Sequence, residues 1–184
     1  MDSLIPTGFL SALTEVSARM AGSEGQGVGV ISLYAQPDAA LYRLPLEHLR
    51  RFERAMERQI RAQLRSHDSL FAVDGKEWLI VLPRVVSTAV LTLGMLRFER
   101  IFNENPLVVD GLDLPVRVVC GAAISPDHGQ DGFHLLQSAR IAGLVAGRSD
   151  CGSLLFEPSM ERSAPNIAVL ERDLRTAFSG GPEL

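Results

Sequence analysis

The chain has 184 residues, of which 46% are hydrophobic, and its formal net charge is −4. This length and composition provide one hydrophobic core of ordinary size, so we expect a single domain with short appendages. The negative charge produces no overall cationic field, which argues against a general binder of nucleic acid or of anionic membranes.

The N-terminal third is predicted to contain two helices with a strand between them. Apolar residues at helical spacing predict a helix over 7–20, and the glycine-rich segment 22–27 ends it. We assign residues 1–26 to an N-terminal helix and linker, and we expect this helix to be a dimer contact. The β-branched run Val28–Tyr34 is typical of a buried strand. A long amphipathic helix follows, predicted by the apolar residues Leu46, Leu49, Phe52, Met56, Ile60 and Leu64.

A β-hairpin is predicted after this helix. Two short apolar runs, Leu70–Val73 and Trp78–Leu82, flank the pair Asp74-Gly75, and an Asp-Gly pair between strand-like segments is a strong hairpin signal. The order β-α-β-β-α-β-α-β predicts the α/β (α+β) class, in a ferredoxin-like arrangement with helices against one face of a mainly antiparallel sheet. The elements predicted after the hairpin are a helix, a strand, a helix and a short strand, over Ser87–Phe102, Leu114–Ile124, Gly132–Ala146 and Ser153–Phe156.

The cysteines and the apolar segments both favour a cytoplasmic protein. Cys120 and Cys151 are too few for a disulfide scaffold and lack the C-x-x-C spacing of zinc and redox sites. The N-terminus lacks the basic and apolar regions of a signal peptide. The most apolar window, Trp78–Leu96, is interrupted by Pro83 and Arg84 and predicts a strand and a helix, so we expect no membrane span.

The hairpin resembles that of the GGDEF domains, which make cyclic di-GMP. Arg65-x-x-Asp68 is followed by five residues and by the tip Asp74-Gly75-Lys76-Glu77-Trp78, which reads DGKEW where the family has GGDEF, and the second strand closes with Leu-Pro. Val119–Ile124 is similar to the family's strand segment S-x-G-x-A, and Leu135–Arg140 is similar to its helix segment L-L-x-x-A-D. The resemblance covers roughly residues 27–158 and implies a degenerate GGDEF domain with a nucleotidyl-cyclase-like fold.

A second resemblance concerns the C-terminal segment. Leu170–Ala177 is similar to the first helix of the EAL phosphodiesterase domain, which often follows a GGDEF domain in one polypeptide. We therefore assign residues 159–184 to a linker and the start of such a helix. This implies that the chain is the N-terminal part of a GGDEF–EAL protein.

The resemblance also implies which catalytic groups the chain has lost. Cyclisation of GTP needs metal ions held by carboxylates, which the family supplies from the third tip residue and from the first strand. Lys76 occupies that tip position, and Val28–Tyr34 contains no acid. Asp74 replaces the first tip glycine and would repel phosphate. The family's guanine-reading residues and its phosphate-holding lysine fall at Leu41, Leu49–Arg50 and Gly147.

We therefore expect no catalytic residue in the motif Asp74, Gly75, Lys76, Glu77 and Trp78, and neither a metal site nor a cofactor. Glu77 matches the fourth residue of the family's tip. Without its partners, we interpret it as a solvated hairpin carboxylate.

The pair Arg65 and Asp68 is retained at the family's offset from the tip. In active relatives an R-x-x-D motif at this place forms an inhibitory site that grips cyclic di-GMP through a guanidinium and a carboxylate. The resemblance implies such a site here, with Arg97 or Arg100 as a second phosphate contact. The alternative is structural, with Arg65 as a cation at a helix C-terminus and Asp68 as a turn residue.

An arginine row is the other prominent feature of the long helix. Two interpretations remain open: a solvated face balanced by the i,i+4 pairs Glu47–Arg51 and Glu57–Arg61, or a docking surface for an acidic partner or for the phosphates of a cyclic dinucleotide. The row consists of Arg50, Arg54, Arg58, Arg61 and Arg65.

Three functions follow from these residues. The first is a catalytically inactive module that regulates an adjacent EAL domain or another signalling protein, or acts through a homodimer. The second is a cyclic di-GMP receptor that binds through Arg65 and Asp68. The third is a cyclase with residual activity. No residue pattern suggests nucleic-acid binding.

Overall fold

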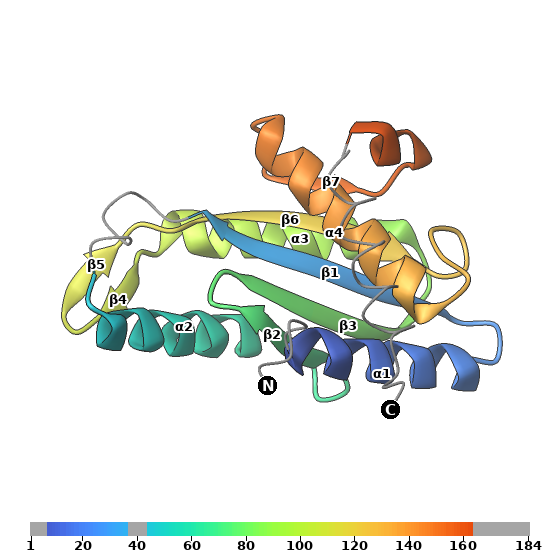
Figure 1. Cartoon of the computed structure of the whole chain (residues 1–184), viewed down its shortest axis with the longest axis horizontal. Helices are drawn as coiled ribbons and strands as arrows, with labels where there is room; N and C mark the ends of the chain where they lie inside the picture. The colour runs from blue at the N-terminus through green and yellow to red at the C-terminus, as the bar shows by residue number, and fades with distance from the viewer. Residues whose placement is uncertain (1–6, 37–43, 164–184) are drawn as a thin grey trace, which may run out of the picture.

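The computed structural model describes residues 7–36 and 44–163, and its core is a five-stranded sheet (Figure 1). The strand order is β2-β3-β1-β6-β7, and all neighbours are antiparallel except β6 and β7. The predicted mixed α/β class is confirmed, and the predicted elements occur in the predicted order, with one further hairpin between α3 and β6. The strands are β1 (Gly27–Gln36), β2 (Ser69–Asp74), β3 (Glu77–Val85), β6 (Arg117–Ile124) and β7 (Ser153–Leu155).

Helices cover both faces of this sheet, so the prediction of helices on one face was wrong. The helices are α1 (Thr7–Gly22), α2 (Leu46–Arg61), α3 (Thr88–Glu104) and α4 (Gly132–Arg148), followed by a short 3₁₀ helix (Pro158–Ser163). Along β1, Ile31 and Leu33 pack with α2 and α3, whereas Val28 and Val30 pack with α1 and α4. A strand that is apolar on both sides requires cover on both sides.

None of the helices in the described residues combines the length and the apolar character that crossing a bilayer requires.

The N-terminal helix α1 belongs to the core of the domain. Phe9, Ala12 and Val16 are fully or almost fully buried and share a core cluster with residues of α4 and of the sheet. The apolar face of α1 is therefore covered within its own domain, and a dimer contact through this helix, which stays a prediction, would have to use its exposed side.

A small hairpin, formed by β4 (Leu107–Val109) and β5 (Leu112–Leu114), packs against α2. The prediction of one strand over Leu114–Ile124 was wrong at its start, because Leu114 belongs to β5 and β6 begins at Arg117. The overlooked signal was a second Asp-Gly pair between short apolar runs. Asp110 and Gly111 both have positive φ, 52° and 77°, as a tight hairpin turn requires.

A close approach between β6 and α4 sets the position of the helix. A Cβ atom at Gly121 would overlap the backbone nitrogen of Gly143 and the carbonyl oxygen of Ala139. Glycine at this position therefore lets α4 lie directly on the sheet.

The EAL-like segment Leu170–Ala177 lies outside the described residues.

Candidate functional site

The tip of the β2–β3 hairpin is closed by the side chain of Asp74. Asp74 pairs with Glu77 across the two-residue turn Gly75–Lys76. Its Oδ1 accepts hydrogen bonds from the backbone N–H groups of Lys76, at 2.8 Å, and of Glu77, at 2.9 Å. The carboxylate of Glu53 on α2 lies against Gly75. The predicted hairpin is confirmed, and Asp74 and Glu53 place two further carboxylates at its tip.

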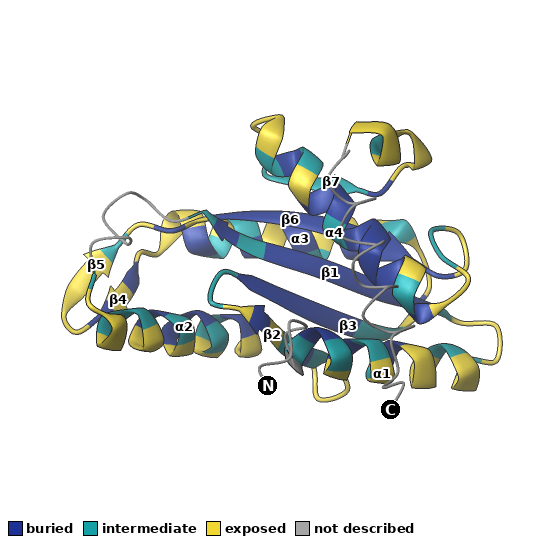
Figure 2. Ribbon diagram, viewed as in Figure 1, coloured by how far each residue is buried: buried dark blue, intermediate teal, exposed yellow. Residues whose placement is uncertain are grey.

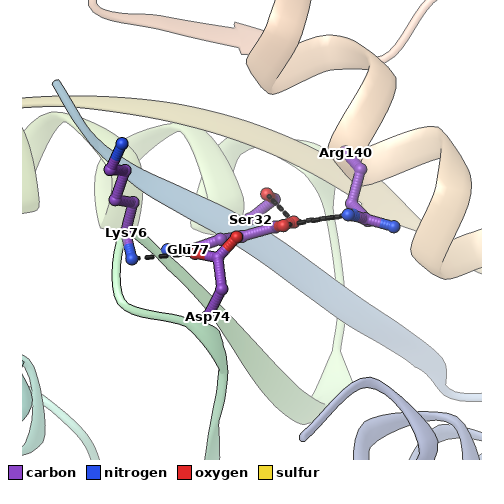
Figure 3. Close-up of polar contacts among 5 residues, drawn as sticks. All are labelled: Ser32, Asp74, Lys76, Glu77 and Arg140. Atoms are coloured by element: carbon purple, nitrogen blue, oxygen red, sulfur yellow. Dashed lines mark hydrogen bonds and ion pairs between the residues drawn. The ribbon is translucent and has the colours of Figure 1, made fainter. Parts of the chain in front are cut away.

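Glu77 is buried, with 5% of its surface exposed, so the interpretation as a solvated carboxylate was wrong. Its Oε1 accepts from Nε of Arg140 at 2.6 Å, and its Oε2 accepts from Nη2 of the same residue at 2.9 Å (Figure 3). The hydroxyl of Ser32 on β1 donates to Oε1 at 3.4 Å. Glu77 lies on the same face of β3 as Leu79 and Val81, which α1 and α4 cover. The side chain of Lys76 extends away from this ion pair (Figure 3).

Arg140 joins three elements at this point. It projects from α4, only 20% of its side chain is exposed, and its guanidinium lies over the ring of Phe9 on α1, 5.3 Å from the centroid. Cation–π contact and a two-pronged ion pair both favour one fixed orientation of a guanidinium. The negative charge of Glu77, the fourth residue of the tip, is therefore neutralised by Arg140 within the domain. Sequence reasoning missed this pair, although Arg140 stands where the family's helix segment has an aspartate.

A cavity of about 430 Å³ opens beside the ion pair, between β1, the hairpin tip and α4. Its lining includes Ser32, Asp74, Glu77 and Arg140, and also Gln137, whose Nε2 is buried without a partner in the described residues. Within 7–36 and 44–163, no three His, Cys, Asp or Glu side chains are grouped so that they would hold a metal ion. The polar groups that line this cavity are thus the ion-paired carboxylate of Glu77, the carboxylate of Asp74 that forms the turn, the hydroxyl of Ser32 and the amide of Gln137.

Arg65 and Asp68 lie on the other face of the sheet. Asp68 Oδ2 accepts from the backbone N–H of Arg65 at 2.8 Å, and Arg65 O accepts from the backbone N–H of Asp68 at 3.1 Å, so the carboxylate closes the turn after α2. Both residues, together with Arg97 of α3, line a cavity of about 530 Å³. Arg100 instead donates to Glu104 at 2.9 Å. The structure therefore brings together three of the four side chains that the resemblance assigned to a ligand site.

The arginine row on α2 is exposed, and the pairs expected to balance it do not form in the described residues. Arg51 donates to Asp110 of the β4–β5 hairpin at 2.6 Å rather than to Glu47. His48 Nδ1 lies 2.7 Å from the other oxygen of Asp110. These contacts attach the small hairpin to α2 and leave the row itself to solvent.

Comparison with known proteins identifies the fold. A scan against protein-family models found no match, and a search of curated proteins found none either. Among solved structures, the GGDEF domain of YfiN (TpbB) from Pseudomonas aeruginosa is 23% identical, with a TM-score of 0.74 over 88% of this chain and 96% of that one. An EAL/GGDEF domain protein from M. capsulatus is 22% identical, with a TM-score of 0.69 over 83% and 98% of the two chains.

The GGDEF domain of DgcB from Caulobacter crescentus, solved in complex with cyclic di-GMP, is 15% identical, with a TM-score of 0.67 over 78% of this chain and 85% of that one. The resemblance that the hairpin suggested therefore predicted the architecture correctly. This chain has the GGDEF-domain fold.

Proposed function

We propose that the chain is a catalytically inactive GGDEF-fold module that acts in the cytoplasm as a regulatory and interaction domain in cyclic di-GMP signalling. The observation that carries this proposal is the ion pair between Glu77 and Arg140, 2.6 Å at its shorter contact. The M. capsulatus structure is described as an EAL/GGDEF domain protein, which supports an EAL domain as one candidate partner.

The argument against catalysis is electrostatic. A cyclase needs carboxylates that are free to hold metal ions against the phosphates of GTP. Here Glu77 is already neutralised by Arg140, Asp74 is engaged in the turn, and Lys76 stands at the metal-ligand position of the family's tip. A divalent cation would have to displace a guanidinium that is itself held by Phe9.

A cyclase assay tests the proposal directly. The chain is incubated with GTP and Mg²⁺ or Mn²⁺, beside an active GGDEF domain, and we expect no cyclic di-GMP above background. Product that is formed by the native chain and lost on Lys76→Ala or Glu77→Gln would establish residual cyclase activity and overturn the proposal.

A second candidate function is that of a cyclic di-GMP receptor. It is favoured by the single cavity that holds Arg65, Asp68 and Arg97, since two guanidinium forks and a carboxylate suit phosphates and a guanine edge. The DgcB structure contains cyclic di-GMP, which shows that this ligand binds to a domain of the same fold.

Calorimetry separates the two functions. A receptor binds cyclic di-GMP, and Arg65→Ala and Arg97→Ala each weaken that binding, whereas Arg100→Ala has little effect because Arg100 is paired with Glu104. Absence of heat at high micromolar ligand would exclude a receptor role. Binding that persists in Arg65→Ala would move the site elsewhere.

A further inference from the structure

The arginines of this domain divide into paired and unpaired groups that occupy different places. In the described residues, ion pairs join Arg19 to Glu15, Arg51 to Asp110, Arg100 to Glu104, Arg117 to Asp150 and Arg140 to Glu77. Among the arginines with no acidic partner in that part of the chain, seven are exposed and either belong to the row that starts on α2 or line the cavity beside α3: Arg50, Arg54, Arg58, Arg61, Arg65, Arg84 and Arg97. We call this set the cationic surface.

The first part of the cationic surface is the exposed side of α2. Its arginines lie opposite the buried residues Phe52, Met56 and Ile60, and Figure 2 shows the exposed outer edge of this helix. Between Arg50 and Arg61 the row extends about 16 Å, at 1.5 Å per residue. Since the remainder of the chain is net negative, acids are attracted to this face in particular.

The second part is the mouth of the cavity between the hairpin and α3. Arg65 continues the row from α2, and Arg84 and Arg97 line the same cavity. Arg84 follows Pro83, and its backbone φ is 59°, a value that residues other than glycine seldom adopt. Arg65 is therefore the residue that the row and the lining of this cavity have in common.

Exposed apolar side chains line the same cavity as Arg65, Arg84 and Arg97. Val86, Val90 and Leu93 line the cavity and have 82%, 40% and 67% of their surface exposed. Leu96, on the same helix, is 49% exposed. An apolar patch rimmed by charge is typical of a surface that binds another protein.

We propose that the cationic surface docks an acidic, amphipathic segment of a partner protein, together with the exposed residues Val86, Val90 and Leu93, which we call the apolar floor. This inference rests on the proposed role as an interaction module and names the chemistry of the partner. Carboxylates on one side of such a segment would meet the arginines of α2, and apolar side chains on its other side would cover Val86, Val90 and Leu93. A nucleic acid or a phosphate would engage the arginines but would leave the apolar floor in water, which is why a protein segment is favoured.

The experiment uses a fluorescein-labelled peptide of about 18 residues, roughly five helical turns, with glutamates on one face and leucines on the other. Anisotropy measures its binding to the full chain. Two matched peptides carry lysine for glutamate, or serine for leucine. Single-stranded RNA and vesicles that contain phosphatidylserine are measured beside them. RNA offers phosphates to the arginines but nothing to the apolar residues, whereas an anionic bilayer offers partners to both.

Three variants locate the surface. The double variant Arg54→Glu with Arg58→Glu reverses two charges of the row and is expected to weaken binding at least 10-fold, since like charges now face the peptide. Leu93→Ser removes an exposed apolar contact and is expected to accelerate dissociation several-fold. The control is Arg117→Glu, an exposed arginine that is paired with Asp150 away from this surface, and it should leave binding unchanged.

Retained binding in the double variant, or equal binding of the serine peptide, would overturn the proposal. Tighter binding of RNA or of vesicles than of the acidic peptide would also overturn it. The same preparations are assayed for cyclic di-GMP synthesis. A chain that synthesises the product but binds the peptide contradicts only the proposed lack of catalysis, whereas an inactive chain with no binding contradicts only the docking surface.

Discussion

Arg140 donates one hydrogen bond to each carboxylate oxygen of Glu77, although the two residues are 63 positions apart in the chain. The pair connects the hairpin tip to α4 beside the cavity that Ser32, Asp74 and Gln137 also line. It also contacts α1 through Phe9, so three separate elements depend on the position of one guanidinium.

The first prediction concerns the stability of this pair. Arg140→Ala leaves the Glu77 carboxylate buried and unpaired, and removal of one partner of a buried pair costs about 3–5 kcal/mol. Urea unfolding followed by circular dichroism should therefore show a much lower free energy of unfolding. Because Glu77→Gln with Arg140→Met removes both charges, we expect this double variant to be more stable than Arg140→Ala alone.

The control for this prediction is the exposed pair Arg100–Glu104. Arg100→Ala should change the free energy of unfolding by less than about 1 kcal/mol, as is usual for surface pairs. Equal losses for Arg140→Ala and Arg100→Ala would show that Glu77 does not need its partner.

A second prediction tests the close packing of α4 on the sheet. Gly121→Ala places a methyl group against the backbone of Gly143 and Ala139, and overpacking of this kind costs about 1–3 kcal/mol or more. Thermal unfolding should reveal the loss. Gly22→Ala is the matched control, because nothing lies within 4 Å of the added Cβ at the end of α1. A stable Gly121→Ala variant would mean that α4 can move away from β6 at little cost.

The third prediction is a pH dependence of the β4–β5 hairpin. The hydrogen bond from the Arg51 guanidinium, with a smaller contribution from His48, holds the pKa of the Asp110 carboxyl below its ordinary value. A carboxyl whose pKa is lower in the folded than in the unfolded state stabilises the fold above the unfolded value, about 3.9, and loses this contribution as the pH falls through the folded value.

Melting curves of the native chain and of Asp110→Asn from neutral to strongly acidic pH test this sign. Asparagine tolerates the positive φ of the turn, so the variant removes the charge and keeps the backbone. The native chain should be the more stable at neutral pH, and the difference should shrink in acid. A difference that grows in acid would contradict the assigned role of Arg51.

The fourth prediction concerns the two thiols. Burial raises the pKa of the Cys120 thiol far above its usual range, and the nearby charge of Glu99 adds to this effect, whereas Cys151 is exposed. Because the thiolate is the reactive form, Ellman's reagent should label one thiol per native chain and a second only after unfolding. Cys151→Ser should abolish the rapid phase. Rapid labelling that persists in this variant would show that Cys120 becomes accessible in the native state.

The residues themselves were sufficient to predict most elements, because the relevant signals are local. Apolar periodicity predicted α1 to α4 to within a few residues, and the Asp74-Gly75 pair predicted the hairpin. The β4–β5 hairpin was missed, although Asp110-Gly111 carries the same local signal. The absence of acids on β1 and the presence of Lys76 at the tip were also visible in the sequence alone.

The tertiary structure decided what lies on each face. Glu77 was interpreted as solvated because the family's catalytic partners are absent, and periodicity could not correct this, since it shows which side chains of a strand point the same way but not whether a helix covers them. Its burial depends on α1 and α4, which pack on the sheet from opposite ends of the chain, and its partner Arg140 is brought close by the contact of Gly121 with α4. The sequence by itself determined most of the elements and the residue types at the hairpin tip, because both depend on neighbours along the chain. Only the long-range packing decided that an arginine from α4 pairs with the Glu77 carboxylate.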